Sequence, residues 1–115
     1  MNKETLNQNQ IAQNELTIVG SIIELAPLRH TPAGVPVLNF RIGHTSEQME
    51  AEVPRKVEVE LAAVGLGQMA MLLKGAKPGE TIKATGFLAA KSANSKQPVL
   101  HVNKIEFVEG INHGI

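Results

Sequence analysis

The sequence predicts an all-β fold, a five-stranded barrel with a short helix between its third and fourth strands. Residues 14–46 contain two apolar, β-branched runs that Pro32, Gly34 and Pro36 separate, as in two long strands joined by a loop. Residues 56–63 alternate between apolar and charged side chains, which is typical of a half-buried strand. Residues 65–74 place leucine and methionine near helical spacing before strand-like runs resume.

The first strand of this barrel contains a glycine between two apolar groups. Leu16 and Ile18 precede Gly20, and Ile22 and Ile23 follow it. A glycine inside a strand allows a sharp bend or a close backbone approach, so this strand can pair in two parts of one sheet. In the second strand, residues 38–43, large apolar side chains alternate with Asn, Arg and Gly, which predicts one buried and one exposed face.

The remaining elements follow from local signals. Gly75 and Pro78 stand where the predicted helix should stop. Residues 81–90 form a fourth strand with a bulge or bend at Gly86, and residues 91–97 form a polar, flexible loop. Residues 98–108 form the last strand. Its apolar residues change phase near Asn103, so we expect a bulge or a strong twist there.

This order of elements matches the five-stranded oligonucleotide/oligosaccharide-binding barrel, the OB-fold. Its ligand surface is built from strands two and three and from the loops after strands one and four. A small SH3-like barrel and an incomplete β-sandwich are the alternatives. Both give the single helix a less natural place.

The length of 115 residues, 43% of them hydrophobic, allows one domain. We expect a polar N-terminal extension at residues 1–13, an OB-fold domain at residues 14–109 and a short tail at residues 110–115. The absence of cysteine, of a secretory signal and of a long apolar run predicts a soluble cytoplasmic protein.

The net charge is zero, but positive and negative residues lie in different parts of the chain. Residues 44–60 carry five glutamates and two cations, whereas residues 74–104 carry six lysines and one glutamate.

Five short motifs carry a resemblance to a known family. They are NELTIVG at 14–20, APLRHTPAGVP at 26–36, GH at 43–44, GF at 86–87 and VLHV at 99–102. Together they resemble the primosomal replication protein N family. The resemblance implies a homodimer of OB barrels that acts in bacterial replication restart, binds single-stranded DNA, associates with the primosomal helicase and helps further components assemble.

Single-strand binders usually combine stacked aromatic rings with a basic groove, and this chain has few rings. It contains no Trp or Tyr. Phe40 and Phe107 share the phase of apolar neighbours and should lie in the core, whereas Phe87 is a candidate base platform or dimer contact. Where members of the family can carry an aromatic residue on the third strand, Glu58 stands between two valines. A carboxylate there repels phosphate and offers no π-face.

The basic candidates for DNA contact are therefore few. Lys91 and Lys96, in the predicted polar loop, are the first choice because long cationic side chains there can follow a DNA backbone. The other candidates are Lys83, Arg29, Arg41, Lys56 and His30. We expect weak, sequence-tolerant and strongly salt-dependent binding.

Other functions find less support in the sequence. The chain has no Asp, its four histidines are dispersed, and it lacks a phosphate-cradling loop, a nucleophile motif and a metal-spaced histidine pair. We therefore predict no enzymatic activity, no cofactor and no metal. The main alternative is a protein-interaction OB module of the primosome with little DNA binding, in which Glu47, Glu50 and Glu52, in the predicted loop after the second strand, meet a basic partner. A general single-strand-coating protein is a third possibility.

Exposed apolar residues such as Ile23, Val35 and Val37 could be covered in a dimer.

Overall fold

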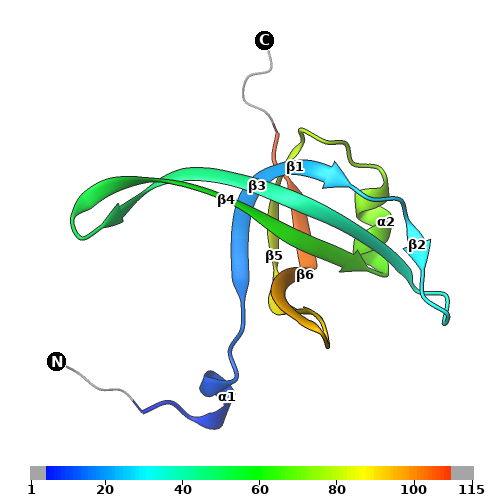
Figure 1. Cartoon of the computed structure of the whole chain (residues 1–115), viewed down its shortest axis with the longest axis horizontal. Coiled ribbons are helices and arrows are strands. Elements are labelled where there is room, and N and C mark those ends of the chain that lie inside the picture. The colour runs from blue at the N-terminus through cyan, green and yellow to red at the C-terminus, as the bar shows by residue number, and fades with distance from the viewer. Residues whose placement is uncertain (1–4, 110–115) are drawn as a thin grey trace.

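The computed structural model describes residues 5–109, and the expected tail at residues 110–115 lies outside them. Figure 1 shows the elements in chain order. They are α1 (Gln8–Ile11), β1 (Leu16–Leu25), β2 (Arg29–His30), β3 (Pro36–Glu50), β4 (Val53–Leu66), α2 (Gln68–Lys74), β5 (Thr81–Ser92) and β6 (Ser95–Phe107). None of the helices in this part of the chain is long and apolar enough to cross a membrane.

Five long strands close into a barrel, which confirms the predicted fold class. The strands pair in the order β1, β5, β6, β4, β3, and a further pairing between β1 and β3 closes the ring. β4 and β6 are parallel, and the other pairs are antiparallel. The two-residue β2 pairs with the start of β3. Helix α2 lies between the third and fourth long strands, as predicted (Figure 1).

The bend of β1 at Gly20 is confirmed. The first half of β1, up to Ser21, pairs with β5, and its second half, from Ser21, pairs with β3. The backbone of Gly20 packs directly on β3: a Cβ atom there would overlap the carbonyl oxygen of Gly43 and come within 2.7 Å of Ile42 Cγ2. Only glycine fits this contact, so one strand serves both halves of the barrel.

Aliphatic side chains fill the barrel, and α2 covers one end of it. The largest fully buried side chains are Ile22, Ile42, Leu73, Ile82 and Leu100. Leu73 comes from α2, which also buries Ala70. The helix ends at Gly75, as predicted, and the backbone N–H of Ala76 donates to the Leu73 carbonyl oxygen at 2.9 Å. Phe40 is 3% exposed, which confirms its predicted place in the core.

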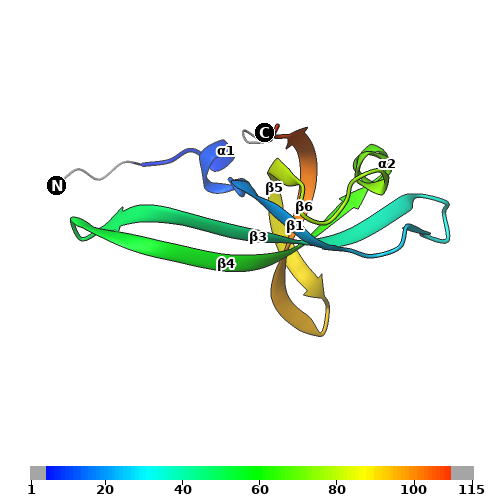
Figure 2. The same ribbon diagram turned by 90° about the horizontal axis from the view of Figure 1, so that it is seen from above.

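The second and third long strands extend far beyond their predicted ends. The β3–β4 ladder continues to the Glu50–Val53 pair, so only Ala51 and Glu52 form the turn. Glu47 and Glu50 therefore lie on a strand and not in the predicted loop. Residues 44–59 project past the barrel as a two-stranded ribbon, here called the β3–β4 arm (Figures 1 and 2).

The predicted polar loop at residues 91–97 is also mostly strand. β5 runs to Ser92 and β6 starts at Ser95, which leaves a two-residue turn. Figure 2 shows that this hairpin leaves the barrel in a different direction from the β3–β4 arm. The predicted irregularity near Asn103 is confirmed, because Thr85 pairs with Lys104 but its neighbour Gly86 pairs with Val102.

Two predictions of side-chain burial are wrong. Phe107 was expected in the core but is 44% exposed, because it sits at the last pair of the β5–β6 ladder, where the core ends. Val37 was expected to be exposed to a dimer partner but is 4% exposed. It packs in a second cluster with Val64 and Val99, together with the partly buried Ala62, outside the main core.

The close approach at Gly20 makes a stability prediction. Gly20→Ala should lower the free energy of unfolding by about 3 kcal/mol, because the added methyl group must displace β3. Gly75→Ala is the matched control, since its φ is −90° and nothing lies within 4 Å of a Cβ there. Urea unfolding of both variants measures the difference. Equal stability of the two variants would contradict the role given to Gly20.

Candidate nucleic-acid interface

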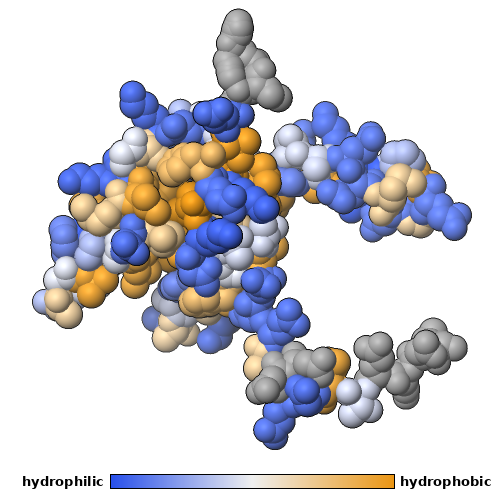
Figure 3. Space-filling model, turned by 180° about the vertical axis from the view of Figure 1, so that it is seen from behind, coloured by the Kyte–Doolittle hydropathy of each residue, from blue (hydrophilic) through white to orange (hydrophobic). Residues whose placement is uncertain are grey.

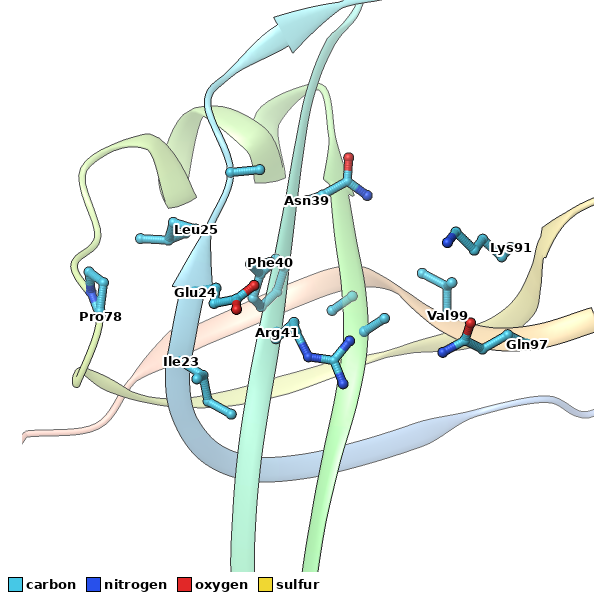
Figure 4. Close-up of a pocket in the computed structure, with 13 residues that line it drawn as sticks. Ile23, Glu24, Leu25, Asn39, Phe40, Arg41, Pro78, Lys91, Gln97 and Val99 are labelled. Atoms are coloured by element: carbon cyan, nitrogen blue, oxygen red, sulfur yellow. The ribbon is translucent and has the colours of Figure 1, made fainter. Parts of the chain in front are cut away.

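A hollow of about 610 Å³ lies against the β3–β4 sheet and the tip of the β5–β6 hairpin (Figure 4). This is the region where the OB-fold places its ligand surface, on strands two and three and the loop after strand four. Its polar lining comes from four elements: Glu24 of β1, Asn39 and Arg41 of β3, Lys91 of β5 and Gln97 of β6.

The alternation of β3 decides which side chains can face this surface. Phe40 and its phase partners point into the barrel, so Asn39 and Arg41 point outward. Opposite them on β4 lie Val64 and Ala62. These are short side chains that pack with Val37 and Val99 in the second cluster. Ala62 and Val99 form an aliphatic floor of the hollow, and Phe40, which also lines it, is 3% exposed and offers no open ring on which a base could stack.

Arg41 lies between two carboxylates. Its Nη2 atom is 3.7 Å from Glu60 Oε1 on β4, and Glu24, its register partner on β1, lines the same hollow. The side chains of Arg41 and Glu60 are 34% and 63% exposed, so water screens this ion pair. The β3–β4 surface therefore carries both positive and negative side chains.

Lys91 and Lys96 lie together at the tip of the β5–β6 hairpin. The ladder pairs Ala90 with Pro98 and Ser92 with Ser95, so Lys91 faces the two residues Lys96 and Gln97 across a bulge. Lys91 also lines the hollow. Within residues 5–109 neither lysine forms a salt bridge, so both charges are available to a ligand.

The other predicted basic residues are more scattered. Arg29 is near the hollow, since its Nη2 donates a hydrogen bond to Asn39 Oδ1 at 3.0 Å. His30 is exposed on β2. Lys83 is on the outer side of β5 opposite Glu106, and Lys56 is on the arm, 3.9 Å from Glu58. The structure thus brings Arg41 and Lys91 to one site and leaves Lys83 and Lys56 outside it.

Phe87 is 42% exposed and has a partner that sequence reasoning missed. Its ring stacks on His101, with centroids 5.1 Å apart and ring planes at 13°. The two residues are a cross-strand pair, and His101 also neighbours Val64 of β4. Only the pairing register reveals this stack, because the bulge at Asn103 shifts the partners of β5 by one residue.

No group of His, Cys, Asp or Glu side chains suited to a metal ion occurs in the described part of the chain.

Comparison with known proteins agrees with this geometry. Residues 14–104 match the model of a family described as "Another single-strand binding protein family". The chain is 35% identical over 101 residues to the replication restart protein PriB of Nitrosomonas europaea, with 88% of this chain and 94% of the relative covered. The PriB of Bordetella pertussis is 37% identical over 97 residues, with 84% and 91% covered. The chain belongs to the PriB family.

Solved structures give the same result. PriB from Ralstonia solanacearum superposes with a TM-score of 0.76 at 34% identity and covers 84% of this chain and 99% of that one. The single-stranded DNA-binding protein of Thermus aquaticus superposes with a TM-score of 0.70 at 19% identity, covering 85% of this chain and 51% of that protein. At this identity the second match supports the OB-fold alone. The predicted family and fold are therefore confirmed.

Proposed function

We propose that this PriB-family protein is a non-enzymatic accessory of the bacterial primosome that binds single-stranded DNA weakly during replication restart in the cytoplasm. The observation that carries the proposal is the hollow of the OB ligand surface, which holds Arg41 and the unpaired Lys91 on a barrel of this family. Lys96 lies beside Lys91, and Arg29 and His30 form the short strand β2 between β1 and β3.

The chemistry of this surface favours contact with phosphates over contact with bases. Arginine and lysine neutralise phosphates of any sequence, whereas base stacking needs exposed rings, each worth roughly 1–3 kcal/mol. The hollow has an aliphatic floor and no exposed ring. The Phe87–His101 stack is the remaining candidate platform, on the outer face of β5 and β6. Binding should therefore be sequence-tolerant, with Lys83 and Lys56 adding little because carboxylates oppose both.

The partners in this proposal are the primosomal helicase and a second copy of the chain. Exposed apolar side chains on the barrel support a dimer: Ile23 and Val35 are 37% and 38% exposed. Covering such residues in a two-fold interface removes apolar surface from water. DNA bound in the hollow leaves other faces of the barrel free, so the protein can contact its helicase partner while it holds a strand.

An alternative function is a protein-interaction OB module of the same primosome with little DNA binding. Glu24 and Glu60 favour it, because they flank the arginine of the ligand surface. The two functions differ in whether the lysines at the hairpin tip contribute to DNA affinity.

The double substitution Lys91→Ala/Lys96→Ala tests the proposed contact. Affinity for labelled oligo-dT should fall about tenfold at low salt, and the slope of log affinity against log salt should become shallower by about 1.4, because each lost phosphate contact removes about 0.7. Fluorescence anisotropy over a salt series measures both quantities.

Lys74→Ala/Lys104→Ala is the control, since it removes the same charge from α2 and from the outer side of β6. An equal loss in both double variants would mean that net charge alone matters. Unchanged affinity in Lys91→Ala/Lys96→Ala, or no affinity in the unmodified protein, would favour the interaction module.

The carboxylate beside Arg41 should weaken DNA binding. Glu60→Gln should raise the affinity for oligo-dT about threefold at low salt, because it removes a negative charge near phosphate and releases the guanidinium. Glu106→Gln, which breaks a similar exposed ion pair with Lys104 at 3.6 Å, should change little. The same anisotropy titration compares the two. A weaker Glu60→Gln complex would show that this ion pair orients Arg41 productively.

The dimer has a direct test in sedimentation equilibrium of the full chain at micromolar concentration. We expect twice the mass of the 12.3 kDa chain, because Ile23 and Val35 leave apolar surface for a second copy to cover. A monomer at these concentrations would refute the dimer without affecting DNA binding.

A further inference from the structure

The β3–β4 arm has two unpaired edges. β1 pairs with β3 from Phe40 to Gly43, and β6 pairs with β4 only at Ala63 and Val64. Residues 44–50 and 53–59 therefore pair with each other and with no third strand in the described chain, and residues 60–62 of β4 likewise have no partner on their outer side. The backbone C=O groups along each outer edge, and the N–H groups except at Pro54, are open to a further strand. In Figure 3 the arm stands clear of the rest of the molecule.

One face of the arm carries three valines. The cross-strand pairs His44–Val59, Ser46–Val57 and Glu50–Val53 place them on the same side. Val53 and Val59 are 59% and 44% exposed. Within the barrel, the same side of β3 and β4 faces the core. The arm extends beyond the barrel, so nothing in the described chain covers this face there.

The root of the arm is fixed by His44. Its Nδ1 donates to the Val19 carbonyl oxygen at 2.6 Å, and its Nε2 is 2.8 Å from Ser46 Oγ. These two hydrogen bonds connect the start of the arm to β1 and hold the valine face in a defined orientation. A pre-ordered strand pair loses less entropy when another strand adds to it.

The charge of the arm selects the kind of partner. It carries Glu47, Glu50, Glu52 and Glu58, and its two cations are each paired internally: Arg55 Nη1 is 3.0 Å from Glu50 Oε1, and Lys56 Nζ is 3.9 Å from Glu58 Oε2. Such a surface repels the phosphates of DNA and also repels a second copy of itself. It attracts a basic chain.

We propose that the free edge of β4 along residues 53–61 is a docking site for an extended protein segment that alternates basic and apolar residues. The segment adds as a strand beside β4, its apolar side chains next to Val53, Val57 and Val59, and its lysines or arginines near the glutamates. The edge of β4 is the docking edge because all three valines belong to this strand. The valine face is opposite to the face that bears Arg41, so the apolar contacts of the segment are separate from the proposed DNA site.

A labelled peptide of alternating lysine and valine, about nine residues long to match this edge, is the probe. The wild-type protein should bind it in an anisotropy titration. Val53→Thr/Val59→Thr should weaken binding at least about tenfold, because threonine keeps the β-branched shape but removes apolar contact. Affinity for oligo-dT should stay unchanged in this variant, which separates this site from the DNA site.

Val108→Thr is the control, since this valine is 45% exposed and lies outside the arm. It should bind the peptide as the wild type does, and thermal unfolding checks that both variants are folded. The proposal is overturned if Val53→Thr/Val59→Thr binds as tightly as the wild type, if the wild type does not bind, or if a lysine–serine peptide binds equally well. A change of mass in sedimentation for Val53→Thr/Val59→Thr would assign the face to a second copy instead.

Discussion

The contact of β1 with β3 at Gly20 and Gly43 is the constraint on which the rest of this structure depends. The two backbones meet there so closely that a side chain on Gly20 would overlap the Gly43 carbonyl oxygen. Because β1 turns at this point from β5 to β3, the sheet closes on itself. Closure surrounds Ile22, Ile42 and Ile82 with other strands, and these fully buried residues stabilise the barrel through apolar burial.

The same contact determines where the arm begins. β1 leaves β3 at Gly43, and from His44 onward the β3–β4 ladder has no neighbour on that side. The regular alternation of β4 continues past this point, so valines that would be core residues inside the barrel become exposed on the arm. The exposed valine face and the closed core are thus two results of one strand geometry.

Local steric signals in the sequence predicted the parts of the fold that depend on single residues. Gly20 marks the bend, Gly75 ends α2, and the phase change at Asn103 marks the bulge. The turn of the arm was not predictable in this way. Ala51 and Glu52 adopt φ of 52° and 66°, a conformation that usually needs Asn or Gly. Features that depend on pairing register, such as the Phe87–His101 stack, could not be read from the sequence either.

The sequence predicted which basic residues the candidate site contains. It did not predict that carboxylates from other strands would lie beside them. The alternation of β3 places Arg41 outward, but strand pairing brings Glu24 and Glu60 beside it from two different strands. The floor of the hollow is aliphatic because Ala62 of β4 and Val99 of β6 line it, while the ring of Phe40 is almost fully buried. In the proposed function, DNA affinity comes mainly from the lysines at the β5–β6 tip, where no carboxylate of the described chain forms a salt bridge with them. On that proposal the OB surface supplies shape, the hairpin tip supplies positive charge, and the acidic arm repels a DNA strand that extends along β3 and β4.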